Sequence, residues 1–183
     1  MRKLFSFSVI ILLFLVGCQN TKNGILDTSK LSKVEMQDVA EEQENHIPSS
    51  YKAPSVKVGL EAIPFKMTLP KNLPFDAKPF QPPTITTNFQ DNKKVRIEFS
   101  TNSKNKKDKI ILGISAFNGE FLEMGDDEAD KISLNNEIQG YYNQNLLKFY
   151  SNGISYLIHY KNDTIPKNQH KKDMIKLANQ ILE

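Results

Sequence analysis

The tightest constraint on how this chain can fold is a turn signal near its end, Ser151-Asn152-Gly153, between two apolar segments. Asn-Gly favours a two-residue turn because both residues tolerate a positive φ, and such a turn joins neighbouring antiparallel strands. Residues 146–150 and 154–160 are therefore predicted to form a β-hairpin. Side chains along the second strand alternate between two faces. Ile154, Tyr156, Ile158 and Tyr160 share one face, and Ser155, Leu157 and His159 share the other.

A helix is predicted to follow this hairpin, over residues 167–182. Its apolar side chains recur at helical spacing and form one stripe, whereas its lysines face outward. The stripe consists of Met174, Leu177, Ala178 and Ile181, and the lysines are Lys171, Lys172 and Lys176. One amphipathic helix must bury its stripe, and the only large apolar surface on offer is a face of the sheet. The expected fold class is α+β: a mostly antiparallel sheet with one C-terminal helix packed on one face.

Further short strands are predicted upstream of the hairpin. The clearest is 95–100, where apolar residues alternate with charged or polar ones, as in a half-buried antiparallel strand. A lysine-rich stretch then connects it to an apolar segment at 110–117, which predicts a second hairpin with a long basic tip. The remaining expected strands are 63–69, 85–89, 131–134 and 138–142.

The first residues have the features of an export signal. Arg2 and Lys3 give a positive start, and an apolar run from residue 4 to residue 16 is interrupted only by two serines. As a helix this run would span about 20 Å, which is too short for the roughly 30 Å hydrocarbon core of a bilayer. Residues 1–17 are therefore predicted to be a signal peptide rather than a permanent membrane span.

Cys18 follows this run directly, in the sequence Leu15-Val16-Gly17-Cys18. These four residues resemble the lipobox of bacterial lipoproteins, in which the cysteine sulfur receives diacylglycerol and a peptidase cuts before it. The resemblance implies a lipid-anchored chain on the extracytoplasmic face of the cell membrane, held stably because two or more acyl chains enter the bilayer. The alternative is an ordinary secreted protein. Cys18 is the only cysteine, so the monomer has no disulfide and must fold by packing alone.

The rest of the chain is predicted to divide into two parts. Residues 18–57 are polar and contain Tyr51 as their only aromatic residue, which indicates a lipid-anchored tether. A flexible coil of this length would reach on the order of 35 Å. Residues 58–183 are expected to form a single globular α+β domain.

Net charge gives little support to a nucleic-acid partner. The chain has 24 Lys and Arg and 21 Asp and Glu, and two of the basic residues are Arg2 and Lys3 in the signal peptide. The mature chain is therefore close to neutral, and export argues further against nucleic acid. Abundant lysine and asparagine, with no tryptophan, are consistent with a low-GC Gram-positive source.

Three short motifs follow one another in residues 58–183. A Leu-Pro-x-x-Leu-Pro segment at 69–74 precedes the Asn-Gly hairpin, and the helix ends in Leu177-Ala178-x-x-Ile181-Leu182. This order resembles small extracytoplasmic domains of unknown function from spore-forming Gram-positive bacteria, found on lipoproteins and on anti-sigma-factor-like chains. The resemblance implies an α+β fold and carries over no catalytic residue. The chain lacks the internal membrane helix of the anti-sigma chains, which argues against direct signalling.

Residues for catalysis or metal binding are sparse. His46, His159 and His170 are too far apart in the sequence for a local zinc motif, so a zinc site would need long-range assembly. The sequence contains no Gly-x-Ser-x-Gly, Ser-x-x-Lys or His-Glu-x-x-His motif, and lipid would consume the thiol of Cys18. We therefore predict no catalytic residue, no metal site and no cofactor. His159 is expected to be exposed or at the rim of the sheet.

Three groups of residues are candidates for binding, each with a simpler structural explanation. An acidic group could hold calcium or be a solvated loop. The basic stretch 103–109 could contact anionic lipids or wall polymers, or be a soluble hairpin tip. An aromatic group could line a ligand groove or form the sheet core. The acidic group is Glu123, Asp126, Asp127, Glu128 and Asp130, and the aromatic group is Tyr141, Tyr142, Phe149, Tyr150, Tyr156 and Tyr160.

An export signal, a lipid anchor and a compact domain without a recognisable catalytic set predict a non-enzymatic interaction or accessory module of the cell envelope. The alternative, from a different class, is a carrier or binding protein for a small hydrophobic or glycan ligand. The expected partners are the membrane, through lipid on Cys18, and either an envelope protein or a small ligand.

Overall fold

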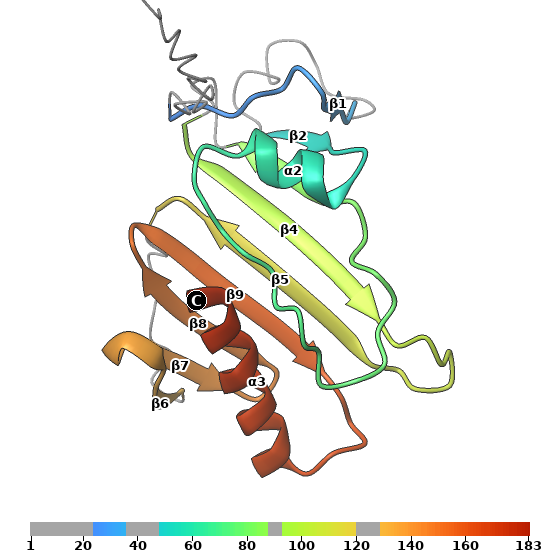
Figure 1. Ribbon diagram of the computed structural model, residues 1–183, viewed down its shortest axis with the longest axis vertical. Coiled ribbons are helices and arrows are strands. Elements are labelled where there is room, and N and C mark those ends of the chain that lie inside the picture. Colours follow the sequence, from blue (N-terminus) through green and yellow to red (C-terminus); the bar gives the residue numbers. More distant parts are fainter. Residues whose placement is uncertain (1–23, 36–47, 88–92, 120–128) are drawn as a thin grey trace, which may run out of the picture.

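The computed structural model describes residues 24–35, 48–87, 93–119 and 129–183. Within them, one nine-stranded antiparallel sheet has the order β1-β2-β3-β4-β5-β9-β8-β7-β6 (Figure 1). The first five strands are β1 (Ser32–Lys33), β2 (Ser49–Lys52), β3 (Thr84–Thr87), β4 (Val95–Asn102) and β5 (Ile111–Phe117). The other four are β6 (Asp130–Ser133), β7 (Gln139–Asn143), β8 (Leu146–Ser151) and β9 (Ile154–Lys161). The α-helices are α2 (Val56–Ala62) and α3 (Lys167–Leu182).

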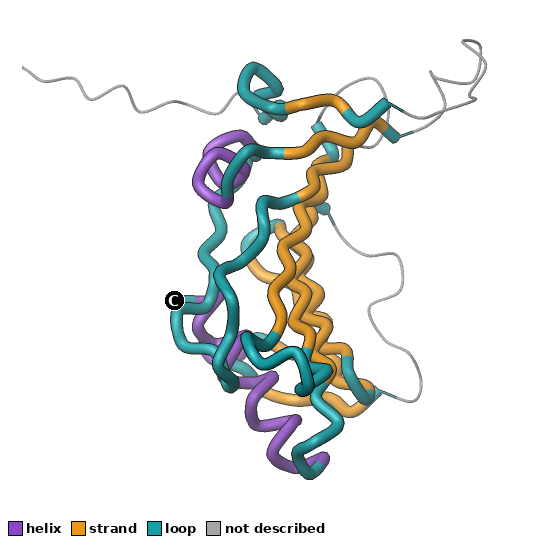
Figure 2. Tube along the Cα trace, turned by 90° about the vertical axis from the view of Figure 1, so that its right-hand side faces the viewer, coloured by secondary structure: helices purple, strands orange, loops and turns teal. Residues whose placement is uncertain are grey.

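The expected fold class is confirmed in its main statement, a mostly antiparallel sheet with a C-terminal helix. The expectation of a single helix is wrong, because α2 forms a second one. Ser55 precedes it and its hydroxyl accepts a hydrogen bond from the backbone N–H of Val58 at 3.2 Å, which satisfies one of the unpaired donors at the helix start. Figure 2 shows both helices on the same side of the sheet.

The Asn-Gly hairpin forms as predicted. Asn152 and Gly153 have φ values of 51° and 81°, in the left-handed region that this type of turn needs. Ser151 pairs with Ile154 directly beside the turn, and the register continues to Leu146 opposite His159. The predicted hairpin of β4 and β5 and the predicted strands at β6 and β7 are also confirmed. Of the strand expected over 85–89, β3 covers the first part, and residues 88 and 89 lie outside the described residues.

The predicted boundary between tether and domain at residue 58 is wrong. Leu26 is 4% exposed and belongs to the hydrophobic core, and the backbone N–H of Asp27 donates to the carbonyl of Ala62 at 3.0 Å. β2 also pairs with β3 along its whole length. These contacts join residues far apart in the sequence, which polarity of the segment alone could not indicate. The folded part therefore begins by Leu26, and any tether must be much shorter.

The expected strand at 63–69 is an extended segment without a strand partner. Its alternation is correct as a pattern of burial: Ile63 and Phe65 are buried, whereas Lys66 is exposed. Pro64 lies within the segment and has no N–H to donate to a ladder. The segment packs against the helix instead, and the Thr68 hydroxyl donates to the carbonyl of Ile181 at 3.2 Å.

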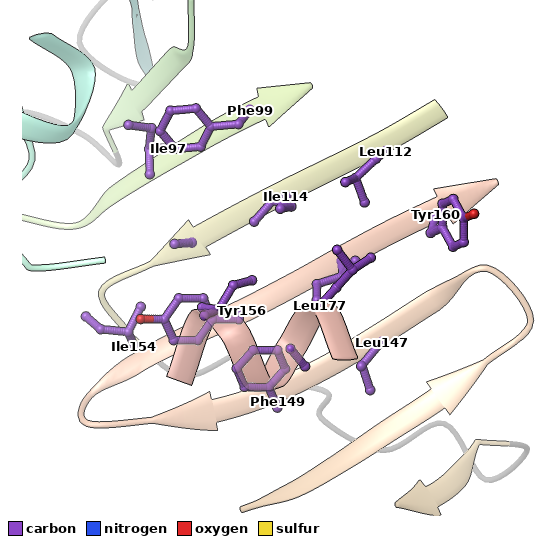
Figure 3. Packing of buried hydrophobic residues seen from close by; sticks show 14 of the residues in the cluster. Ile97, Phe99, Leu112, Ile114, Leu147, Phe149, Ile154, Tyr156, Tyr160 and Leu177 are labelled. Carbon is purple, nitrogen blue, oxygen red and sulfur yellow. The ribbon is translucent and has the colours of Figure 1, made fainter. Parts of the chain in front are cut away.

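The core lies between the sheet and α3. All four residues of the predicted apolar stripe are buried, and Tyr156, Ile158 and Tyr160 of β9 are buried beneath the helices. Figure 3 shows this packing, with Leu177 of α3 facing the side chains of β8 and β9. In the described part of the chain, no helix combines the length and the hydropathy that crossing a bilayer requires.

On the opposite face of the sheet the residues of β9 are Ser155, Leu157 and His159, as predicted. His159 is exposed, which confirms its predicted position. Ser155 is nevertheless buried, because its hydroxyl donates a hydrogen bond to the carbonyl of Gly119. Two large apolar side chains are exposed on this face, Ile111 at 47% and Tyr150 at 36%.

Candidate functional site

Several residues named from the sequence fall outside the described residues. They are Cys18, His46, Glu123, Asp126, Asp127 and Glu128. Of the acidic group only Asp130 is described, at the start of β6, where its carboxylate accepts a hydrogen bond from Lys171 Nζ at 2.9 Å. This bond, together with the lysine charge, holds the pKa of Asp130 below its ordinary value. Asp130 thus links β6 to α3 through this ion pair.

The aromatic group does not line one surface. Tyr142, Phe149, Tyr156 and Tyr160 are buried on the face covered by the helices, whereas Tyr141 and Tyr150 lie on the opposite face. β7 and β8 alternate their side chains between two faces, so neighbours such as Tyr141 and Tyr142 must separate. A single aromatic groove across the sheet is therefore wrong, and within the group Tyr156 lines a pocket.

This pocket has a volume of about 540 Å³ and lies between the C-terminal turn of α3, the extended segment 63–69 and the tip of the β8–β9 hairpin. Its size falls in the range of about 300–1,000 Å³ that is typical of small-molecule sites. We call it the Tyr156 pocket. Its apolar lining is Leu60, Phe65, Met67, Ile154, Ile181 and Leu182, and its more exposed polar lining is Lys66, Thr68, Ser151, Asn152 and Glu183.

Tyr156 contributes a phenol hydroxyl to this pocket. Its ring is buried and stacks on Phe149, with ring centroids 4.9 Å apart and planes inclined by 14°. The hydroxyl has no hydrogen-bond partner among the residues that the structure describes. Burial raises the pKa of the Tyr156 phenol above its ordinary value of 10.0, so the group is protonated at neutral pH. It can therefore donate to or accept from a bound molecule.

A second pocket, of about 690 Å³, lies on the other side of Leu60 and Lys66, which line both pockets. α2 supplies Val56, Val58 and Leu60 to its apolar part, and Lys30 and Lys57 are among its charged residues. Asp27 also lines it, and hydrogen bonds from Ser29 lower the pKa of the Asp27 carboxyl. The two pockets thus border one another along the outer side of α2.

His170 is buried near the start of α3 and connects the helix to two strands. The Tyr142 hydroxyl and His170 Nδ1 form a hydrogen bond of 3.1 Å, and His170 Nε2 donates to the Tyr160 carbonyl at 2.8 Å. A carbonyl oxygen can only accept, so His170 Nε2 carries a proton. Both ring nitrogens are therefore occupied, and a metal ion or a substrate would have to displace one of these bonds. The arrangement has the features of a structural cross-link.

Metal binding finds no support in the described residues, since no three His, Cys, Asp or Glu side chains among them lie close enough to share an ion. His159 projects from β9 opposite Gly113 of β5, on the face away from the helices. Asp173 is buried within α3 and its carboxylate accepts a hydrogen bond from Gln169 Nε2 at 2.7 Å. His159 and Asp173 therefore lie on opposite sides of the sheet and share no site.

The basic stretch 103–109 forms the tip of the β4–β5 hairpin, as predicted. Asp108 holds its turn by accepting hydrogen bonds from the Ser103 hydroxyl at 3.4 Å and from Asn105 Nδ2 at 3.1 Å. Lys104 Nζ lies 2.8 Å from a carboxylate oxygen of Asp76. Lys106, Lys107 and Lys109 are exposed. The tip is thus a compact turn in which acidic residues offset part of the lysine charge.

Sequence reasoning named His170 but missed its buried position between α3 and two strands, and it missed most of the walls of the Tyr156 pocket. A signal for His170 was present, because it lies four residues before Met174 and continues the apolar stripe by one turn. The alternation at 63–69 likewise marks Phe65 and Met67 as inward-facing residues. Nothing local indicates that these residues meet the end of α3. Comparisons with protein families, with curated proteins and with solved structures find no match to this chain.

Proposed function

We propose that this chain is an extracytoplasmic lipoprotein, anchored to the cell membrane through lipid on Cys18, and that its folded part is a non-enzymatic interaction module of the cell envelope. The observation that carries the anchoring is the sequence of a basic start, a short apolar run and Leu15-Val16-Gly17-Cys18. Folded residues begin a few positions later, which fits a cysteine left at the start of a mature chain.

Two observations support the proposal of an interaction module: the roles of the buried His170 and Asp173, and the side chains that the sheet exposes. The imidazole of His170 and the carboxylate of Asp173 are both engaged in hydrogen bonds within the fold. The face of the sheet away from the helices instead exposes Ile111 and Tyr150, which are large side chains available for contact. Exposed apolar and aromatic residues of this kind are common at binding surfaces.

Anchoring is tested by feeding cells an alkyne-tagged fatty acid while they express the full chain. The parent chain should take up the tag and fractionate with membranes, and Cys18→Ala should take up none. A matched control restores one cysteine elsewhere, as Asn105→Cys in the Cys18→Ala background, and it should stay untagged. Tagging of that control, or of Cys18→Ala itself, would contradict a lipobox cysteine.

The interaction module is tested by photo-crosslinking in the same cells. A photoreactive residue at position 111 or 150 should form a discrete adduct with an envelope protein, because both side chains are exposed on one face. The same residue at Lys172, which is exposed on α3 on the other side of the sheet, serves as the control. Equal crosslinking from all three positions would indicate non-specific capture and would count against this face.

A second function, binding of a small hydrophobic ligand, is favoured by the Tyr156 pocket. Its lining offers apolar side chains to the body of such a ligand, and the Tyr156 hydroxyl, which has no hydrogen-bond partner among the described residues, would orient a polar group of the ligand. Native mass spectrometry of residues 19–183 purified from bacteria tests it. A reproducible excess mass that is lost on denaturation, and is reduced by Tyr156→Phe, is the expected result. Retention of the same mass by Met67→Trp, which fills the pocket, would exclude this site.

A further inference from the structure

The surface around α2 combines apolar and cationic side chains. Ile25 is 44% exposed, directly before the buried Leu26, and α2 adds the half-buried Val56 and Val58. Exposed lysines of the same region are Lys30, Lys33, Lys57 and Lys66. Three acidic residues, Asp27, Glu35 and Glu61, share the surface, so lysines outnumber them. We call this surface the α2 end.

Acidic residues leave part of this lysine charge uncompensated. Lys57 Nζ lies 3.9 Å from Glu61, but both side chains are largely exposed, so the pair is screened by solvent. The Asp27 carboxylate accepts hydrogen bonds from Ser29 within its own turn. Lys30 acts on the Asp27 carboxyl by its charge, but neither Lys30 nor Lys66 forms a salt bridge with a carboxylate among the described residues, and both line the apolar pocket beside α2. This surface suits an anionic partner that also presents apolar groups.

The length of chain before the fold decides which partner can reach it. Gly24, the first described residue, comes six positions after Cys18. Since an extended chain spans at most about 3.6 Å per residue, the anchored cysteine lies within about 22 Å of Gly24. Residues 24–33 and α2 lie together at the upper end of the molecule in Figures 1 and 2. A lipid on Cys18 therefore keeps the α2 end close to the bilayer.

The basic tip of the β4–β5 hairpin has more lysines in a short stretch but is placed differently. Figure 1 shows it toward the lower end of the molecule, away from residues 24–33 and α2. Its lysines are accompanied by Asp76 and Asp108, which are bonded within the tip and its neighbouring loop. Ile25, Val56 and Val58 have no counterpart in the tip sequence, which is polar throughout.

We propose that the α2 end docks on the anionic surface of the membrane, with Lys30, Lys57 and Lys66 among the phospholipid headgroups and Ile25 at their apolar boundary. The inference rests on the proposed lipid anchor, which brings this end to the bilayer. Each lysine near an anionic surface adds attraction, and apolar side chains add burial at the interface. Docking fixes the orientation of the domain, so the basic tip of the β4–β5 hairpin points away from the lipid.

The lone cysteine allows a test that does not depend on lipidation by a cell. The chain from Cys18 onward is coupled through its thiol to a maleimide lipid in vesicles of phosphatidylcholine, with or without phosphatidylglycerol. Lysines are then acetylated with a reagent that does not cross membranes, and mass spectrometry reads the extent at each position. We expect reactivity of Lys30, Lys57 and Lys66 to fall several-fold on the anionic vesicles alone, and reactivity of Lys106 and Lys107 to stay unchanged.

Matched charge reversals give the control. Lys30→Glu with Lys57→Glu should restore the reactivity of Lys66 on anionic vesicles, whereas Lys106→Glu with Lys107→Glu should change nothing. Equal protection on both vesicle types, protection at the hairpin tip instead, or no protection at all would each overturn the docking. Because the chemical link replaces the lipid anchor, any of these results leaves the Cys18 tagging experiment to decide the proposed function by itself.

Discussion

Two tyrosines on the same face of β9 occupy opposite kinds of surroundings. Tyr160 is stacked between Phe75 and His170, with ring centroids at 5.9 Å and 4.9 Å, and its hydroxyl accepts a hydrogen bond from Asn162 Nδ2 at 2.9 Å. Tyr156 stacks on one ring, that of Phe149, and its hydroxyl opens into a pocket. Figure 3 shows the two side chains toward opposite ends of β9. The core is therefore covered by side chains at the Tyr160 end, which we call the closed end, and borders a pocket at the Tyr156 end, which we call the open end.

The difference follows from what covers each tyrosine. The proline-rich segment after residue 69 places Phe75 over Tyr160, and the first turn of α3 places His170 on the other side of the same ring. Over Tyr156 the cover is the last turn of α3 and the segment 63–69, which leave a pocket between them. At the Tyr160 end, the packed rings and the hydrogen bond to the hydroxyl stabilise the fold. At the Tyr156 end, the hydroxyl has no hydrogen-bond partner among the described residues and can bind a ligand. Substitutions at the two ends should therefore separate stability from ligand binding.

The largest effect is expected from Tyr160→Ala. Removing a fully buried aromatic ring that stacks on two partners should lower the free energy of unfolding by about 3–5 kcal/mol. Urea unfolding followed by circular dichroism measures the loss. Tyr150→Ala is the matched control, since that ring is exposed on the opposite face, and its effect should stay within about 0.5 kcal/mol. Similar losses in both variants would mean that the Tyr160 end is not closed.

Tyr142→Phe should have the next largest effect. It removes the hydroxyl that is hydrogen-bonded to His170 Nδ1 and leaves that buried ring nitrogen without this partner, at a cost of about 1–3 kcal/mol. Urea unfolding of Tyr141→Phe provides the comparison, because the neighbouring tyrosine lies on the other face of β7. In ¹⁵N-detected NMR, the signals of the His170 ring nitrogens should also change in Tyr142→Phe, because the tautomer equilibrium depends on this hydrogen bond. An unchanged imidazole in the variant would argue against this hydrogen bond.

A smaller effect is expected above the ordinary tyrosine pKa of 10.0. Burial raises the pKa of Tyr142 and of Tyr160, because the protein interior disfavours the charged phenolate. The unfolded chain therefore loses these protons first, so the related stability is fully present below pH 10.0 and is lost as the pH rises through the folded-state pKa values. Unfolding free energies measured across this range should decline less steeply in Tyr142→Phe than in the parent chain. An equal decline would contradict the assignment.

The face that Tyr156 and Tyr160 share and the helix stripe that covers it could be predicted from the sequence, because both follow from local periodicity. Alternation along 154–160 places Tyr156 and Tyr160 on one face, and helical spacing identifies the stripe that covers them. The Asn-Gly turn fixes the register of β8 with β9, so the facing residues follow as well. These signals act over a few residues, where backbone geometry alone decides the outcome.

The pocket could not be read in the same way, because its walls meet across long sequence separations. Phe65 and Met67 come from a segment interrupted by Pro64, whose pattern indicates buried positions but not the element they pack against. For a related reason, the sequence did not predict that the folded part already includes Leu26. Ile25 and Leu26 are adjacent apolar residues in a mostly polar stretch, and nothing local indicates that Leu26 is buried while Asp27 bonds to Ala62, far along the chain.

The smallest effect on stability is expected from Tyr156→Phe. This variant tests most directly how the Tyr156 end of the core differs from the Tyr160 end. The hydroxyl makes no hydrogen bond to the described residues, so its loss should change the free energy of unfolding by no more than about 0.5 kcal/mol. Urea unfolding of Tyr160→Phe, which removes the acceptor of Asn162 Nδ2, is the matched measurement and should show the greater loss. If the two variants lose the same stability, then the Tyr156 hydroxyl has a structural partner and is not available to a ligand. If Tyr156→Phe is neutral but still reduces a bound mass, then the open end of the core is the binding end.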